Sequence, residues 1–168
     1  MIRPILLLGE PRLYEVSTAV GPSELPALEA VVADLHDTLM DYRARYGAGR
    51  AMAAPQIGVM KRLIYMHIDR PMVFVNPVLT FEDGEEMDVL DDCMSFPGLY
   101  VRLRRHRRCR VDYTGLEGNP HTVRFEGDLS ELIQHEYDHL DGILATQRGA
   151  DARALVMRVM EKNAWPEG

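Results

Sequence analysis

The chain is poor in cysteine and in positive charge, and it has no long apolar run. Its two cysteines, Cys93 and Cys109, are too few for the disulfide framework of a small secreted domain. The formal net charge of −7 argues against nucleic acid as a bulk partner, and against DNA in particular, because a phosphate-binding domain usually carries a basic surface. A signal-peptide pattern and a run of 18 apolar residues are both missing, so we expect a cytoplasmic protein that does not associate with membranes.

Apolar residues are plentiful enough for one core. The chain has 168 residues, of which 46% are hydrophobic, and this length favours a single domain over residues 1–168. From residue 22 to residue 46 the apolar side chains recur at helical spacing, with Ser23 as the expected N-cap and Gly47 just past the end. After the loop at residues 47–49, Pro55 and Gly58 favour irregular or edge-strand backbone.

The rest of the chain alternates between strand-like runs and turn signals, followed by two helical patterns. Strands are predicted at residues 62–68, 72–79, 86–90, 100–113 and 122–125. A second helix is predicted to begin at Asp128 or Leu129 and to end at Gly142, and a last helix covers residues 151–163. This order indicates an α+β fold in which mostly antiparallel strands pack around the second helix.

The second predicted helix carries a metal-binding pattern, because residues 134–139 read Q-H-E-Y-D-H. Residues four apart on a helix lie on one face, with Cβ atoms about 5 to 6 Å apart, so His135 and His139 can share one metal ion. Glu136 beside that ion can take a proton from metal-bound water, whose pKa the ion lowers, and pass it to a leaving group. Asp138 is expected either to support a ligand histidine or to form a salt bridge on the helix surface.

Two imidazoles leave a metal site incomplete, and the third protein ligand decides the kind of hydrolase. A metzincin needs a further histidine where this chain has Ala145, so that class is excluded. A thermolysin-like site would use Glu161, which stands alone without a supporting motif and reads more simply as a solvated carboxylate. The remaining candidate is Cys93, whose thiolate would complete a Cys/His/His tetrahedron with one position open for water.

Three segments in this order resemble the motifs of peptide deformylases, and the resemblance covers nearly the whole chain. The family patterns G-x-G-L-A-A-P-Q, E-G-C-L-S and Q-H-E-x-D-H correspond to residues 49–56, 91–95 and 134–139. The resemblance implies a metal-dependent amidase that removes the formyl group from the N-terminal formylmethionine of nascent polypeptides. It also implies Cys93 as the third ligand, Fe(II) as the ion, and an oxyanion hole made by the Gln56 amide and the Met94 backbone N–H. Zn(II), Co(II) and Ni(II) are further candidates for the ion.

The match has departures that bear on the substrate. Arg50 and Ala51 depart from the first motif and Asp92 from the second, while Glu131 stands one turn before His135, where a deformylase has an apolar or basic residue. We expect backbone groups to bind an extended peptide as an added strand, and an Arg50–Glu131 ion pair to shape the pocket rim. The residues expected to bind substrate are Gly49, Arg50, Ala51, Met52 and Glu131.

Two other functions stay open at this point. One is a deformylase-like amidase that acts on another small N-acyl substrate, which Arg50, Ala51 and Asp92 favour. The other is a catalytically silent metal-binding module associated with the ribosome, although mere metal binding requires neither Glu136 nor Gln56.

The arginine-rich stretch at residues 102–110 is the one basic stripe in an acidic chain. We expect a solvated strand face whose arginines pair with the surplus acids, and contact with ribosomal RNA is the alternative. Cys109 alternates in phase with Val101 and Leu103, which predicts a position in the core.

Overall fold

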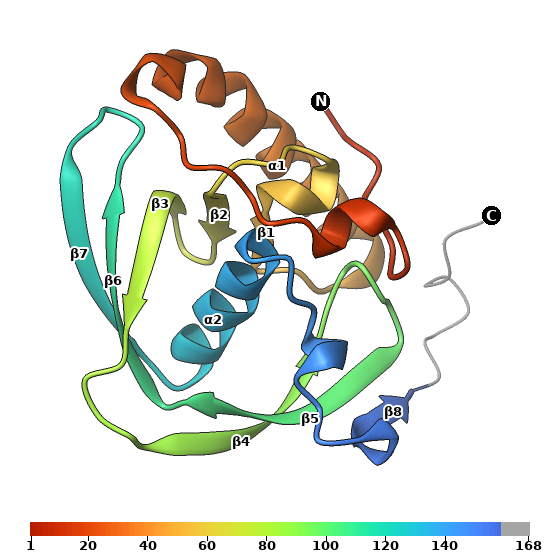
Figure 1. Cartoon of the computed structure of the whole chain (residues 1–168). Helices are drawn as coiled ribbons and strands as arrows, with labels where there is room; N and C mark the ends of the chain where they lie inside the picture. The colour runs from red at the N-terminus through yellow and green to blue at the C-terminus, as the bar shows by residue number, and fades with distance from the viewer. Residues whose placement is uncertain (159–168) are drawn as a thin grey trace.

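The computed structural model describes residues 1–158, which form two α-helices and two antiparallel sheets (Figure 1). The predicted α+β class with antiparallel strands is confirmed. A five-stranded sheet has the order β1-β2-β3-β6-β7, and a three-stranded sheet has the order β4-β5-β8. The helices are α1 (Leu25–Tyr46) and α2 (Asp128–Leu140), and the strands are β1 (Ala51–Ala53), β2 (Leu63–His67), β3 (Pro71–Thr80), β4 (Glu86–Asp92), β5 (Leu99–His106), β6 (Arg108–Thr114), β7 (Pro120–Glu126) and β8 (Leu155–Met157).

The long helix α1 follows the apolar spacing seen in the sequence. It turns Leu28, Leu35 and Leu39 into the core and ends at Gly47, whose positive φ of 66° suits glycine. Its beginning differs from the prediction, because residues 22–24 form a separate 3₁₀ turn and Ser23 lies inside that turn. The side chain that accepts a backbone N–H there is Glu24, which binds the N–H of Gly21 at 2.7 Å.

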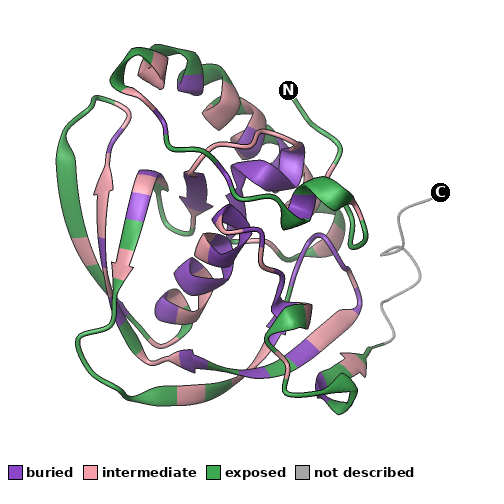
Figure 2. Ribbon diagram, in the orientation of Figure 1, coloured by how far each residue is buried: buried purple, intermediate pink, exposed green. Residues whose placement is uncertain are grey.

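The second helix α2 lies at the centre of the molecule and contacts strands of both sheets (Figure 1). Most of its surface is buried, as Figure 2 shows. Ile133 and Leu140 are fully buried in the core that α2 forms with the five-stranded sheet. Leu140 is the last helical residue, two positions before the predicted end. This central position encloses the H-E-x-x-H residues in protein instead of leaving them at the surface.

The predicted strand at residues 100–113 is in fact two strands, β5 and β6, which belong to different sheets. At the break, the N–H of His106 donates to Gln134 Oε1 at 3.0 Å, and Gln134 Nε2 donates to the carbonyl of His106 at 2.8 Å. The backbone N–H of Gly127 donates to the carbonyl of Arg107. Gln134 of α2 and Gly127 just before α2 therefore form hydrogen bonds with the backbone at the break between the two strands. Cys109, two residues after Arg107, is buried as predicted.

The predicted last helix at residues 151–163 is wrong over its described part. Residues 152–154 form a 3₁₀ turn and β8 follows, pairing antiparallel with β5 so that Leu99 faces Met157. Pairing with a strand far back in the chain has overridden the helical spacing of the sequence, as tertiary contacts often do. Residues 159–163 of that prediction, including Glu161, lie outside the described residues. Within residues 1–158, no helix has the length and apolar character needed to cross a bilayer.

Candidate active site

Three potential metal ligands converge in the interior. Cys93 follows the end of β4, while His135 and His139 project from α2, and all three are buried with their ligand atoms within 4.8 Å of one another. The Sγ of Cys93 is 3.3 Å from Nε2 of His139, less than the roughly 4.3 Å sum of one Zn–S and one Zn–N bond length. A single ion can therefore contact both. A thiolate with two imidazoles suits Zn(II), Fe(II) or Co(II), so the residues present fit the expected ion.

The loop after β4 surrounds the Cys93 sulfur with donors. The N–H of Ser95 lies 3.4 Å from Sγ, and Nε2 of Gln56 lies 3.5 Å from it. These contacts hold the sulfur in place beside the two histidines. The carbonyl of Cys93 accepts the N–H of Phe96 in the same turn, so the backbone fixes the direction of the side chain.

His135 is oriented by a buried carboxylate. Its Nδ1 donates to Asp91 Oδ1 at 2.7 Å, which leaves Nε2 for the ion and fixes the tautomer. Burial would raise the pKa of Asp91, but the charges of His135 and Arg105 and their hydrogen bonds outweigh it and hold that pKa at about 2. Asp91 is therefore ionised over the physiological range.

Behind Asp91 runs a row of alternating charges, which we call the ionic chain: Asp91, Arg105, Asp138 and Arg148. Arg105 donates to Asp91 Oδ2 at 2.7 Å and to Asp138 Oδ2 at 2.6 Å. Arg148 then donates to both oxygens of Asp138, at 2.6 and 2.5 Å. Asp138 meets neither expectation as stated: it contacts no ligand histidine, and its salt bridges to Arg105 and Arg148 are made by a buried carboxylate instead of one on the helix surface.

Arg105 corrects the expectation that the whole arginine-rich stretch lies on a solvated face. Its side chain is only 3% exposed. The signal was present in the sequence, because Arg105 has the same strand parity as Val101 and Leu103, which are also buried. Four of the other arginines behave as predicted and pair with surplus acids: Arg104 with Glu86, Arg107 and Arg108 with Glu85, and Arg110 with Asp112. Arg102 is exposed and forms no ion pair among the described residues.

Glu136 is placed for proton transfer. It is buried on α2 and lines the same cleft as Cys93 and His135. Its Oε2 is buried and has no hydrogen-bond partner among the described residues. Burial is the main cause that raises the pKa of Glu136 to about 7. A carboxylate oxygen held without a partner inside a cleft is available to a group that binds there.

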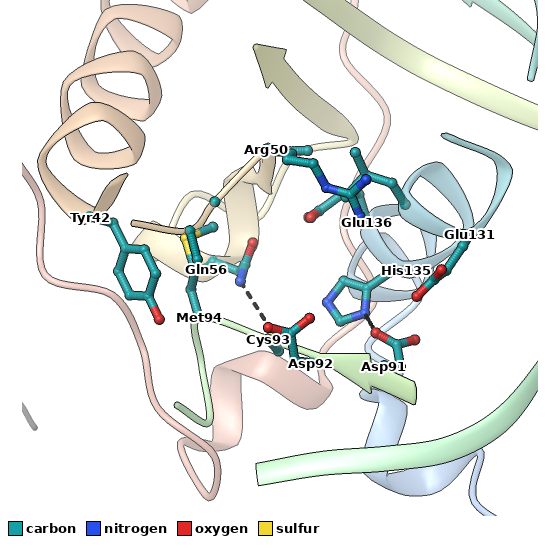
Figure 3. Close-up of a pocket in the computed structure, with 14 residues that line it drawn as sticks. Tyr42, Arg50, Gln56, Asp91, Asp92, Cys93, Met94, Glu131, His135 and Glu136 are labelled. Carbon is teal, nitrogen blue, oxygen red and sulfur yellow. Dashed lines mark hydrogen bonds and ion pairs between the residues drawn. The ribbon is translucent and has the colours of Figure 1, made fainter. Parts of the chain in front are cut away.

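Gln56 and Met94 lie on the opposite wall of the cleft, on the side of Cys93 (Figure 3). Gln56 is fixed in a 3₁₀ turn, where its Oε1 accepts the N–H of Ala53 at 2.9 Å. That bond directs Nε2 at Cys93 and at Ser95 Oγ. The backbone N–H of Met94 has no hydrogen-bond partner among the described residues. Two donors therefore stand beside the metal ligands.

The segment expected to bind substrate is an edge strand. β1 pairs with β2 on one side, with Ala51 opposite Met66, and it ends the order of the five-stranded sheet. Ala51 has no positive φ, so it takes the place of a glycine here without backbone strain. The preceding Gly49 does have a positive φ of 114°, and a Cβ there would lie 3.2 Å from Leu39. The positions of Gly49, Arg50, Ala51 and Met52 agree with strand addition.

The cleft has a volume of about 80 Å³, and Arg50, Asp92 and Glu131 also line it (Figure 3). The predicted Arg50–Glu131 ion pair is wrong, since these two residues line the same cleft but no ion pair joins them in the described part of the chain. Glu131 is half-buried, and burial is the largest cause that raises its pKa, with the charge of Arg50 acting in the opposite direction. The charge of Arg50 thus acts on Glu131 across the cleft, although the two side chains form no ion pair.

This fold and this site are those of a metal-dependent hydrolase, in which Cys93, His135 and His139 could hold a metal ion and the two histidines belong to an H-E-x-x-H helix. The chain belongs to the polypeptide deformylase family, whose family model matches residues 2–154. It is 37% identical to a peptide deformylase of Zymomonas mobilis over 151 residues, covering 84% of this chain and 82% of the relative. It is also 37% identical to a peptide deformylase of Parafrankia sp. over 167 residues, with 98% and 88% covered.

Solved structures show the same relationship. The peptide deformylase from Thermotoga maritima superimposes with a TM-score of 0.82 at 28% identity, covering 90% of this chain and 99% of that one. A peptide deformylase from Legionella pneumophila gives a TM-score of 0.82 at 32% identity, with 92% and 89% covered. The resemblance seen in the motifs is confirmed.

Proposed function

We propose that this chain removes the formyl group from the N-terminal formylmethionine of new polypeptides and releases formate. The observation that carries the proposal is the meeting, in one cleft, of the Cys93, His135 and His139 ligand atoms with the unpartnered carboxylate oxygen of Glu136. Membership of the deformylase family supports it. A catalytically silent module has no use for a buried, unpartnered carboxylate, so that alternative loses its support.

The ion would be held by Cys93, His135 and His139, and when bound it supplies Lewis acidity that lowers the pKa of a coordinated water toward about 7. Glu136 accepts the proton at Oε2 and returns it to the nitrogen of the leaving amine. Asp91 keeps His135 in the tautomer that binds through Nε2. We propose Fe(II) as the native ion, with Zn(II), Ni(II) or Co(II) as substitutes.

Gln56 and Met94 stabilise the negative charge that develops on the formyl oxygen. Gln56 Nε2 already points at the Cys93 side of the cleft, and the Met94 N–H lacks another partner within residues 1–158. Donors that are fixed before the reaction stabilise the transition state at little reorganisation cost. The peptide itself adds to the edge strand β1 through the backbone of residues 49–52.

The test is formate release from formyl-Met-Ala-Ser by anaerobically prepared Fe(II) protein, followed with a formate-specific coupled assay. Acetyl-Met-Ala-Ser and unblocked Met-Ala-Ser are the controls, and Glu136→Gln is the matched inactive variant. Formate from the formyl peptide alone is the expected result. No formate from the wild-type protein at full metal occupancy would contradict the proposed function.

We also propose that the protein is located in the cytoplasm and contacts the ribosome transiently, where nascent chains emerge. Cosedimentation with ribosomes at low and high salt checks the contact, since binding of arginines to RNA phosphates weakens steeply with salt. Pelleting that does not depend on salt would argue against the arginine-rich stretch at residues 102–110 as the contact.

A further inference from the structure

The guanidinium group of Arg43 is bound to backbone carbonyls and to no carboxylate in the described part of the chain. Arg43 lies near the end of α1 and is partly buried. Its Nε and Nη2 donate to the carbonyl of Gly49 at 3.0 and 2.8 Å, and Nη2 also donates to the carbonyl of His67. By contrast, Arg45 of the same helix pairs with Asp41. The donors of Arg43 therefore hold two peptide groups instead of matching an acid.

Both carbonyls lie at the beginning of the strand that is expected to bind substrate. Gly49 is two residues before β1, and His67 ends β2, the neighbour of β1. Two residues that face each other in a hydrogen-bonded antiparallel pair exchange both of their N–H···O bonds. Here the N–H of His67 donates to the Arg50 carbonyl at 2.8 Å, but the reverse bond is not formed within residues 1–158. Arg43 donates to the His67 carbonyl in its place, and the N–H of Arg50 has no partner in the described structure.

Arg43 also fixes the direction of this unpartnered N–H. The carbonyl of Gly49 and the N–H of Arg50 belong to one planar peptide group, and in a trans peptide the two point in opposite directions. Since the Gly49 carbonyl points at the Arg43 guanidinium, the Arg50 N–H points away from it. The Arg50 carbonyl faces His67 in β2, so the N–H of Ala51 points away from β2 for the same reason. Gly49, Arg50 and Ala51 all line the cleft.

The loop that Arg43 holds has little else to fix it. Gly49 has a positive φ of 114°, and glycine loses more conformational freedom than any other residue when it is ordered. All hydrogen bonds that the backbone of residues 47–49 makes within the described chain go to Arg43. The N–H of Gly47 donates to its carbonyl, and the carbonyl of Gly49 accepts from its side chain. Arg43 therefore sets the conformation of the chain as it enters β1.

The position of this loop decides which part of a substrate it meets. β1 leads to the 3₁₀ turn Ala54–Ile57, which carries Gln56 beside Cys93. A formyl group at Gln56 lies at the far end of β1 from Gly49, so the peptide that follows it runs back along β1 toward Gly49. Main-chain hydrogen bonds of an added strand contribute affinity. They lie away from the reacting carbon, so they stabilise bound substrate and transition state alike, and their loss raises KM with little effect on kcat.

We propose that Arg43 is a positioning residue for the substrate. By holding the carbonyls of Gly49 and His67, it presents the N–H groups of Arg50 and Ala51 to the backbone of the incoming formyl peptide. An edge that is ordered before binding loses less conformational freedom when the peptide adds to it. This inference rests on the proposed deformylase activity and adds a residue outside the cleft to the way in which the substrate is bound.

The experiment measures KM and kcat separately for formyl-Met-Ala-Ser with Arg43→Met at equal metal occupancy. Methionine keeps an unbranched apolar stem and removes every donor. We expect KM to rise about 10-fold or more and kcat to change less than about twofold, because hydrogen bonds from a charged group that order the binding edge are lost. Arg43→Lys keeps the charge without the planar fork, so its KM should fall between the two. Unfolded protein lowers apparent kcat and leaves KM unchanged, so a destabilised variant does not imitate this result.

Arg45→Met is the matched control, because it removes an exposed arginine of the same helix whose partner is Asp41. It should leave KM and kcat unchanged. A rise in KM as large as that of Arg43→Met would show a general effect of α1 and overturn the inference.

A binding measurement separates recognition from chemistry. Zinc-loaded Glu136→Gln protein should bind formyl-Met-Ala-Ser without hydrolysing it, and calorimetry gives Kd. Adding Arg43→Met should raise that Kd by the same factor as KM. An unchanged KM and Kd, or a loss confined to kcat, would overturn the role of Arg43 while deformylase activity stands. If the wild-type protein releases no formate, the proposed function fails, and the comparison of Kd values still decides the role of Arg43. Absence of binding as well would overturn both.

Discussion

Replacing Arg105 with methionine should destabilise the protein more than the same replacement at any other arginine of residues 102–110. The side chain is 3% exposed and contacts two carboxylates, Asp91 and Asp138, that are themselves buried. Methionine has a similar length and fills most of the space, so the effect comes mainly from charge. Removing one member of a buried ion pair costs about 3–5 kcal/mol. His135 still contacts Asp91 and Arg148 still contacts Asp138, which keeps the cost within that range.

That loss of folding free energy corresponds to a readily measured decrease in Tm. A chain of 168 residues loses about 2–4 °C of Tm for each kcal/mol, so Arg105→Met should lower Tm by about 6–20 °C. The melts are recorded with excess EDTA and again at saturating metal, because an ion that binds only the folded state raises Tm by mass action. Loss of support for His135 should also weaken metal affinity about 10–100-fold in chelator competition.

Arg148→Met is the matched control, since it removes the outer member of the same ionic chain. Its side chain is 42% exposed, so solvent screens the pair and the expected cost is below about 2 kcal/mol. If Arg105→Met costs less than about 1 kcal/mol and keeps wild-type metal affinity, the ionic chain does not support the site. Equal losses in the two variants would show that burial does not set the strength of these pairs.

Three further changes separate the proposed roles. Glu136→Gln should keep the ion and lower kcat by at least about 100-fold, because the geometry survives and proton transfer does not; wild-type-like turnover at equal metal occupancy would refute the role. Cys93→Ser should weaken metal affinity in chelator competition, since a hydroxyl is a poor ligand for a borderline ion, while Cys109→Ser should bind the ion as the wild type does. Gln56→Leu should bind metal normally and lower kcat by about 10²–10³; a change confined to KM would show that Gln56 binds the ground state instead.

The meeting of Cys93, His135 and His139 could be predicted from the sequence, for two different reasons. His135 and His139 need only helical spacing to meet, and Cys93 lies in a short motif whose order along the chain is specific. The core position of Cys109 followed in the same way from strand alternation. The predictions for the two histidines and for Cys109 depend on neighbours within a few residues, whereas that for Cys93 depends on the order of three motifs.

Features that depend on pairing between distant segments could not be predicted. Strand β8 forms because β5 offers it a partner, and no spacing within residues 151–157 shows that. The break between β5 and β6 depends on Gln134, which reaches His106 from another element. Arg50 and Glu131 share a cleft without contact, and only the positions of β1 and α2 decide the distance between their side chains.

The origin of the three ligands has a consequence for biosynthesis. Cys93 and His139 are 46 positions apart in the chain, and β1 to β7 all precede α2. A growing chain therefore cannot assemble the full ligand set until His139 has been synthesised, by which time both the strand that precedes Cys93 and most of the larger sheet are already available. An ion captured at that moment ties the central helix to the end of β4 and closes a long loop, which favours the folded chain over the unfolded one. A chain truncated before α2 lacks both histidines and would not gain that stabilisation.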